Sequence, residues 1–321
     1  MNPFIIIGGC PRSGTTMVRN MLNSHPDVFI FPQTQFINKI WGARRLVNFK
    51  KNRLKMLQII AEDAAVKRSG IDIFSSNRSK SNEFNDYFDE YLDFIRDYCT
   101  NNSDGPSFIG DKTPRHVMFV DLLKKNIQTD LKTIVIVRDS RAVIASMKAR
   151  KLVRSIESGA AIWNFFCKHI LFLLRRYSEN EILLLKYEDI VVDPLARSKD
   201  ISKFIGLDYN DSMVKIQNHN SSFIKNKKMG IFSDSLDIWK NNLSLSEINK
   251  ITYFTKKYLE YFKYETSMIS TTDLPVLSHA VYRASLIREV FTLLLMQMGL
   301  FPSLFVGVIK NLGKRSVGNK R

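Results

Sequence analysis

The sequence predicts an α/β fold of the doubly wound type, in which a mainly parallel sheet is flanked by helices. Two observations predict it. Short apolar runs typical of buried strands, at 4–8, 133–137 and 181–186, alternate with segments of helical spacing. A polar segment follows each run directly, at 9–16, 138–141 and 187–189. Because parallel strands end at the same edge of a sheet, these segments predict one ligand site at that edge.

The first strand, residues 4–8, leads into a glycine loop that makes the predicted fold P-loop-type. Gly9, Gly14 and Thr16 have the spacing of a nucleoside-triphosphate loop, G-x-x-x-x-G-K-[ST]. Thr15, however, occupies the position of the lysine that neutralises the β- and γ-phosphates in such loops. The sequence therefore predicts a phosphate cradle whose cation must come from elsewhere.

The helix after this loop is predicted to begin near Gly14 and to end before Pro26. Backbone N–H groups of the loop and the helix N-terminus then converge on an anion. Arg12 adds a guanidinium that binds an anionic group in bidentate fashion, which lysine does not do. The residues predicted to bind the anion are Pro11, Arg12, Ser13, Gly14, Thr15 and Thr16. A plain glycine turn between strand and helix is the alternative.

Residues 38–106 are less regular and are predicted to form a helical cap inserted over the core, not a separate domain. They contain, in order, a basic stretch (44–68), a polar segment rich in serine and asparagine (75–82) and an aromatic, acidic helix (84–98). A short strand edge is expected at 108–110. The core domain is expected to extend over 1–270.

The strand at 133–137 ends at Arg138, and a helix is predicted around 142–150. Arg138 at the strand end and Ser146 on the helix are expected to close on one set of phosphate oxygens. The alternative is a surface Arg–Asp pair next to a small helical residue.

The strand at 181–186 leads to a predicted helix that Asp193-Pro194 caps and that ends near Gly206. Aspartate before a helix accepts hydrogen bonds from its first turn, and proline fits the first helical position. This element completes the strand–helix alternation of the core.

Residues 278–321 are predicted to form an apolar, basic-flanked helical tail. Positions 290–309 carry no formal charge. This uncharged stretch is long enough to span a bilayer, but Pro302 and two glycines interrupt it. Cations flank the stretch on both sides: Arg283, Arg288, Lys310, Lys314, Arg315, Lys320 and Arg321. Three interpretations remain open: an anchor in or on an anionic membrane, a helix pair packed on the core, and an oligomer interface.

Composition narrows the class of protein. The 321 residues carry a net charge of +17, which fits a nucleic acid, an anionic lipid surface or a small polyanionic substrate as partner. No nucleic-acid-binding motif is found, so no nucleic-acid partner is expected. The three cysteines lack metal-ligand spacing, and no metal site is predicted. No signal peptide is recognised, so a cytoplasmic location is expected, at the inner face of the membrane if the tail binds there.

Several motifs resemble those of PAPS-dependent sulfotransferases, with the membrane-type and bacterial carbohydrate or tyrosylprotein enzymes closest. The segments 11–22 (PRSGTTMVRNML) and 24–28 (SHPDV) resemble the 5′-phosphosulfate loop, and 138–141 with Ser146 resembles the 3′-phosphate motif. The segments 186–189 (KYED) and 110–116 (GDKTPRH) are similar to two further family stretches, and 227–230 faintly resembles a late basic-glycine segment.

The resemblance covers about residues 3–265 and implies a donor, 3′-phosphoadenosine 5′-phosphosulfate (PAPS), that is used without a metal. It implies that Lys228 and Gly230 contact the 3′-phosphate and that Tyr187 contacts the nucleotide. It also implies an acceptor with a hydroxyl (or amine). The cap is expected to select that acceptor, and a tail at the membrane would favour a saccharide, glycolipid or polysaccharide.

For catalysis, the resemblance indicates Arg12 and Lys112 as cations that stabilise the transition state. The general base is expected to be Asp111, with His116 or no protein base as alternatives. Related enzymes have a glutamate where this chain has Gln33, within Pro32-Gln33-Thr34, and glutamine cannot act as a base.

Two other functions remain as alternatives. A P-loop nucleotide kinase or hydrolase would need a lysine in place of Thr15 and an aspartate for Mg²⁺ after a strand. A catalytically inactive nucleotide-binding protein at a membrane surface would fit Gln33 and the apolar tail.

Overall fold

The computed structural model describes residues 2–45, 53–62, 67, 87–102, 105–127, 129–216, 234–266 and 274–300. The chain divides into two compact units, which are described separately. The first comprises Met1–Phe31 and Gly105–Glu289, and the second comprises Pro32–Asp104 and Val290–Arg321. The expected cap, residues 38–106, lies almost entirely within the range of the second unit.

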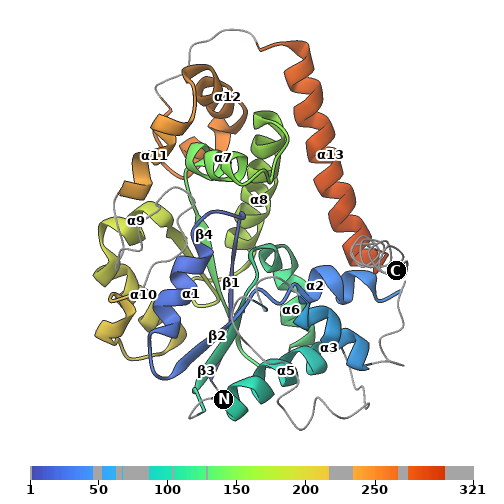
Figure 1. Ribbon diagram of the computed structural model, residues 1–321. Coiled ribbons are helices and arrows are strands. Elements are labelled where there is room, and N and C mark those ends of the chain that lie inside the picture. Colours follow the sequence, from blue (N-terminus) through green and yellow to red (C-terminus); the bar gives the residue numbers. More distant parts are fainter. Residues whose placement is uncertain are drawn as a thin grey trace, which may run out of the picture. The chain divides into compact units, whose positions relative to one another are not determined.

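The first unit is built on a five-stranded sheet in the order β2-β3-β1-β4-β5 (Figure 1). The strands are β1 (Phe4–Gly9), β2 (Val28–Pro32), β3 (Phe108–Lys112), β4 (Leu131–Val137) and β5 (Ile182–Lys186). The pairs β1/β3, β1/β4 and β4/β5 are parallel. The strands of such a sheet are covered on both faces, so their sequences are nearly continuous apolar runs. The parallel pairing confirms the predicted α/β class with a mainly parallel sheet.

Helices cover the sheet and complete the first unit. They are α1 (Thr15–Asn23), η4 (Pro114–Phe119), α6 (Val120–Asn126), α7 (Ser140–Ala149), α8 (Ile156–Arg176), α9 (Tyr187–Val192), α10 (Pro194–Ile205), η5 (Asp211–Met213), α11 (Asp234–Asn242) and α12 (Leu245–Tyr261). Helices α1, α9 and α10 share one buried apolar cluster with β1 and β4. The η4 turn packs against β1 so closely that a Cβ at Gly8 would lie 2.8 Å from that of Val117.

The helix ends predicted from turn and cap residues lie where the sequence places them. Asp193 accepts a hydrogen bond from the Ala196 N–H at 2.9 Å, and Gly206 ends α10 in the left-handed conformation, with φ of 77°. His25 stabilises the turn after α1, because its Nδ1 accepts from the Asp27 N–H and its Nε2 contacts the Asp208 carbonyl. These bonds satisfy backbone groups that helix termini leave without partners.

The described part of the second unit consists of α2 (Phe36–Lys39), η1 (Trp41–Ala43), α3 (Arg53–Ala61), α5 (Tyr87–Asn102) and the end of α13 (Val276–Met298). Aromatic rings hold it together: Phe36 stacks on Tyr91 at 4.5 Å, and Trp41 packs against Phe88 at 4.8 Å between ring centroids. The aromatic helix predicted at 84–98 thus corresponds to α5.

Among the helices in the described ranges, none is both long enough and apolar enough to cross a bilayer. The helix α13 includes the first part of the uncharged stretch 290–309, and residues 301–321 lie outside the described residues.

Candidate active site

The loop between β1 and α1 has the curled backbone of an anion cradle. Gly9, Arg12 and Gly14 have positive φ angles of 149°, 76° and 98°. A Cβ at Gly14 would lie 2.3 Å from a ring carbon of Tyr187, so only glycine fits there. The prediction from the sequence is that backbone N–H groups of this loop converge in one concavity, and positive φ angles of this kind are compatible with it.

Buried hydroxyls line the loop. Ser13 has no exposed surface, and within the described part of the chain its Oγ has no hydrogen-bond partner. Thr15, in the lysine position, is 4% exposed. Because buried polar groups in folded proteins are almost always paired, the buried Ser13 hydroxyl is a candidate contact for a ligand atom.

Three arginines gather beside the loop. Arg12 Nε donates a hydrogen bond to Ser146 Oγ at 2.9 Å, which joins the loop to α7. The pKa of Arg12 is lowered to about 10, chiefly by burial and then by the positive charges of Arg150 and Arg138. Clustered cations repel one another, so such an arrangement favours a bound polyanion. The sequence analysis missed Arg150, which follows the last turn of α7.

Tyr187 connects Arg138 with the loop. The Arg138 guanidinium lies over the Tyr187 ring, 4.0 Å from its centroid. The same ring packs so closely on Gly14 that a Cβ there would clash with it. Stacking of this kind orients a guanidinium and leaves its edge for other contacts. The structure therefore brings the predicted residues Arg12, Arg138, Ser146 and Tyr187 together at the ends of β1, β4 and β5.

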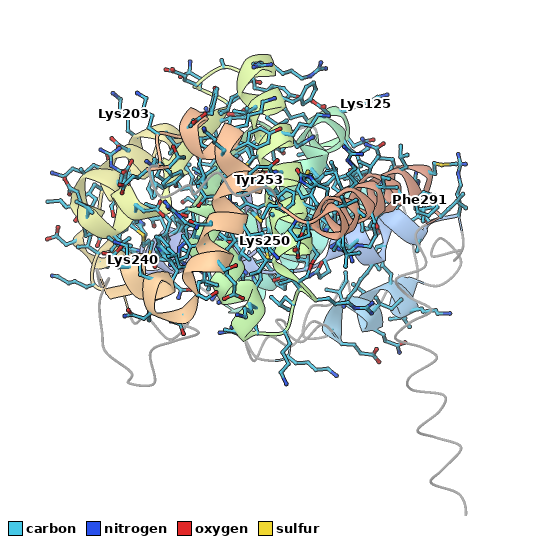
Figure 2. The ribbon with its side chains drawn as sticks, turned by 90° about the horizontal axis from the view of Figure 1, so that it is seen from above. Lys125, Lys203, Lys240, Lys250, Tyr253 and Phe291 are labelled. Carbon is cyan, nitrogen blue, oxygen red and sulfur yellow. The ribbon has the colours of Figure 1, made fainter. Side chains whose placement is uncertain are left out.

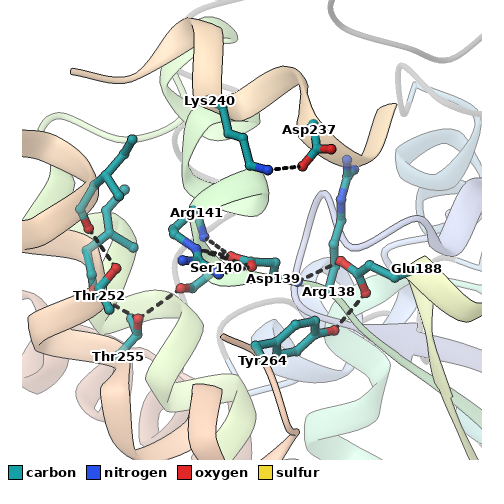
Figure 3. Close-up of polar contacts among 12 residues, drawn as sticks. Arg138, Asp139, Ser140, Arg141, Glu188, Asp237, Lys240, Thr252, Thr255 and Tyr264 are labelled. Carbon is teal, nitrogen blue, oxygen red and sulfur yellow. Dashed lines mark hydrogen bonds and ion pairs between the residues drawn. The ribbon is translucent and has the colours of Figure 1, made fainter. Parts of the chain in front are cut away.

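A buried polar network fixes the turn that carries Arg138 (Figure 3). Asp139 caps α7 and binds Arg141, with Arg141 Nη2 donating to Asp139 Oδ2 at 2.6 Å. Glu188 accepts from the Asp139 N–H at 3.1 Å and from the Tyr264 hydroxyl at 2.8 Å. Burial raises the pKa of Glu188, although these hydrogen bonds oppose the shift. Sequence reasoning did not identify this network.

Arg141 has a structural role in this network. Its guanidinium is held by Asp139 and lies 4.5 Å from the ring centroid of Trp239, which is itself 5% exposed. Trp239 belongs to the apolar core between α7, α8, α11 and α12. Trp239 is therefore a core residue that also packs against the Arg141 guanidinium.

We expect Asp139→Ala to lower the free energy of unfolding by about 3 kcal/mol, because it leaves the buried Arg141 guanidinium without its carboxylate. Asp193→Ala is the matched control: it removes another helix cap but leaves no buried charge, and should cost about 1 kcal/mol. Urea denaturation of both variants measures the difference. Equal losses of unfolding free energy in the two variants would show that the Asp139–Arg141 pair stabilises the fold no more than an ordinary helix cap.

The end of β3 adds a second group of predicted residues at the same sheet edge. Asp111 pairs in register with Ile6 of β1, and Lys112 is 5% exposed. The side chains of Asp111 and His116 have no exposed surface, and His116 Nδ1 lies 3.6 Å from Asp111 Oδ1. Burial lowers the pKa of His116, against the opposing effect of Asp111. A neutral imidazole thus lies beside the carboxylate.

We expect the protein to lose stability as the pH falls from 7 to 5, in part because of His116. The folded state holds this buried imidazole neutral, whereas the unfolded chain binds a proton at the ordinary histidine pKa. Protonation therefore favours unfolding below that pH. His169, whose pKa burial also lowers, contributes in the same direction. Denaturant unfolding at several pH values should show a shallower decline for His116→Gln; an unchanged decline would contradict this account.

The remaining predicted positions are placed as follows. Lys228 and Gly230 lie outside the described residues. Gln33 belongs to the second unit. Cys10 and Cys167 are buried, and burial raises the pKa of both thiols. Over the described ranges, no three His, Cys, Asp or Glu side chains are grouped so as to hold a metal ion.

The fold and this loop define an α/β protein with a P-loop-type anion cradle. Its sequence matches the sulfotransferase family over residues 3–211. The chain therefore belongs to the sulfotransferase family.

Two curated relatives are similar to the chain over about two thirds of its length. Protein-tyrosine sulfotransferase A of Caenorhabditis elegans is 25% identical over 219 residues, which cover 66% of this chain and 52% of that protein. Protein-tyrosine sulfotransferase 1 of Danio rerio is 26% identical over 223 residues, covering 66% and 55%. The chain thus spans about half the length of the curated relatives it matches.

Solved structures share the fold. The sulfotransferase domain from the Synechococcus PCC 7002 olefin synthase superposes with a TM-score of 0.59 at 22% identity, covering 85% of this chain and 96% of that domain. The sulfotransferase domain from the curacin biosynthetic pathway gives 0.58 at 20% identity, covering 83% and 99%. At this level of identity the likeness shows the fold.

Proposed function

We propose that the protein is an enzyme that transfers a sulfuryl group from PAPS to a hydroxyl (or amine) of an acceptor, without a metal. The observation that carries this proposal is the joining of two anion sites through the Arg12–Ser146 hydrogen bond. The loop is proposed as one site, and Arg138 with Ser146 as the other; the charges of Arg150 and Arg138 both act on Arg12. A nucleotide with anionic groups at both its 5′ and 3′ positions fits such a pair.

The residues favour PAPS over ATP with Mg²⁺. The loop has Thr15 where a triphosphate-binding loop has lysine, and it offers main-chain N–H groups, the Ser13 hydroxyl and Arg12 instead. Ser146 is buried on α7. We propose that it binds the 3′-phosphate together with Arg138, and that Tyr187, whose ring lies under the Arg138 guanidinium, contacts the nucleotide. Lys228 and Gly230 are proposed to complete the 3′-phosphate contacts, on the resemblance of their segment.

In this mechanism the acceptor oxygen bonds to sulfur as the bond from sulfur to the 5′-phosphate oxygen breaks. Arg12 and Lys112 stabilise the charge that develops on that bridging oxygen. Asp111 is the proposed base, and it takes the acceptor proton with the neutral His116 beside it at 3.6 Å. There are two alternatives: His116 is the base, or the transfer uses no protein base. The pH–rate profile of Asp111→Asn distinguishes them.

Two classes of acceptor are proposed, a saccharide hydroxyl and a tyrosine phenol. A tail at the membrane would favour a saccharide, glycolipid or polysaccharide hydroxyl as acceptor, whereas the matched relatives are named for protein tyrosine. A tyrosine phenol has a pKa near 10 and loses its proton more readily than a sugar hydroxyl, so it depends less on a base. This chain has Gln33 where related enzymes have glutamate, and glutamine cannot act as a base. The acceptor that the enzyme uses therefore indicates how far the reaction depends on a protein base.

Transfer of radiolabelled sulfate from PAPS to two acceptor panels tests the proposed function. One panel contains tyrosine peptides with acidic neighbours, and the other contains oligosaccharides and glycolipids. Labelled product in either panel that depends on PAPS supports the function and identifies the acceptor class. No transfer to either panel, despite nucleotide binding, would favour a catalytically inactive nucleotide-binding protein.

A further inference from the structure

The helix α13 (Val276–Met298) exposes an apolar stripe on one face, most of it between Ile287 and Met298. Residues at spacings of three and four lie on one face of a helix, and those that fall on this stripe are Val276, Ile287, Val290, Phe291, Leu294 and Met298. Phe291, labelled in Figure 2, is 60% exposed and Ile287 is 68% exposed. Large apolar side chains repeated in this way on a surface mark an interaction site.

The opposite face of α13 is already engaged. Within the first unit, Glu289 accepts from Arg115 Nη2 at 3.0 Å, and the Ser278 hydroxyl donates to Glu157 at 3.0 Å. Within the second unit, the Arg44 guanidinium donates to the Gln297 carbonyl at 2.7 Å and caps the helix C-terminus. The bonds of the Glu289 and Ser278 side chains hold the helix by the face opposite the apolar stripe.

Positive charge accompanies the stripe. Arg283 and Arg288 are exposed on α13, the following stretch to residue 309 carries no formal charge, and five cations lie between 310 and 321. The whole chain has a net charge of +17. An apolar surface with basic flanks is typical of segments that lie in the interface of an anionic bilayer.

We propose that the exposed stripe of α13 docks on the surface of an anionic lipid bilayer, with the helix in the plane of the interface. An in-plane position agrees with the finding that no described helix can cross a membrane. A second copy of the chain fits less well, because Arg283 falls on the same face as the stripe and would be buried against apolar side chains. At a bilayer the long arginine side chain reaches the phosphate headgroups while its methylenes stay in apolar contact.

Docking has a consequence for the active site, and this consequence alone rests on the proposed function. Glu289, on the face of α13 opposite the stripe, is paired with Arg115, which lies three residues after Lys112 in the segment with the candidate catalytic residues. The docked helix is thus bonded to the catalytic segment, which favours an acceptor displayed on lipid.

The test is co-sedimentation of the full-length protein with vesicles of phosphatidylcholine containing 30% phosphatidylglycerol, and with phosphatidylcholine alone. We expect partitioning to the anionic vesicles that weakens with added salt. Phe291→Ser/Leu294→Ser should reduce it by about tenfold or more, because two apolar side chains no longer enter the interface. Val192→Ser/Leu245→Ser is the matched control, since these side chains are 73% and 65% exposed on other helices. Arg283→Glu is a second, charge-changing variant that should reduce binding several-fold.

Thermal unfolding confirms that each variant is folded. Absence of vesicle binding by the wild-type protein would overturn the proposal. Equal binding by the wild type, the stripe variant and Arg283→Glu would also overturn it and assign membrane affinity to another part of the chain. If the wild type forms a dimer and binds no vesicles, and the stripe variant is a monomer, the stripe is an interface between copies of the chain. None of these outcomes depends on sulfate transfer, so failure of the proposed function is separately detectable.

Discussion

Arg138→Ala is expected to weaken binding of adenosine 3′,5′-bisphosphate, the desulfated product of PAPS, by about a hundredfold. The guanidinium is held over the Tyr187 ring beside Arg12 and Arg150, where a phosphate dianion relieves the repulsion between these cations. Binding of adenosine 5′-phosphate, which lacks the 3′-phosphate, should weaken by less than about threefold. Titration calorimetry with both nucleotides measures the two ratios.

The comparison between nucleotides is the internal control, because a general disturbance of the site would weaken both. Arg175→Ala removes an exposed arginine near the end of α8 and should change neither affinity. A similar loss for both nucleotides in Arg138→Ala would contradict the assignment of Arg138 to the 3′-phosphate.

Lys112→Met is expected to lower kcat by about a hundredfold while the affinity for adenosine 3′,5′-bisphosphate changes by less than about threefold. The lysine is buried at the end of β3, and methionine keeps most of its volume, so the fold should tolerate the change. An ammonium that acts mainly on charge developing in the transition state affects the rate more than ground-state binding.

Single-turnover transfer rates and product affinity, measured on the same preparation, separate the two effects. Lys125→Met is the control, since Lys125 is exposed on α6, where Figure 2 labels it. If affinity falls by the same factor as the rate, Lys112 binds the nucleotide and has no special part in the chemical step.

The sequence predicts the centre of the fold because its local signals agree. β1, β4 and β5 are short apolar runs that end in polar segments, and the structure places β1 and β4, and β4 and β5, side by side. The glycine loop and the Asp193 cap are equally local, since their residue types follow from the backbone conformation at those positions. Such features are readable without tertiary structure.

Other elements leave weaker signals. β2 (Val28–Pro32) follows the turn at His25-Pro26 directly and ends in proline, and it was not predicted from the sequence. α8 (Ile156–Arg176) buries residues around most of its circumference, which obscures the helical periodicity. Parts of the site depend on contacts distant in sequence: Glu188 meets the Asp139 N–H from 49 positions away, and Arg150 approaches Arg12 only after β1 and α7 are assembled.

Calorimetric comparison of adenosine 3′,5′-bisphosphate with ADP in the presence of Mg²⁺ tests the central claim most directly. A site with two separate anion pockets and no loop lysine should bind the bisphosphate at least about a hundredfold more tightly, with no requirement for Mg²⁺. Equal or tighter binding of ADP with Mg²⁺ would contradict the account and indicate an enzyme of nucleoside triphosphates.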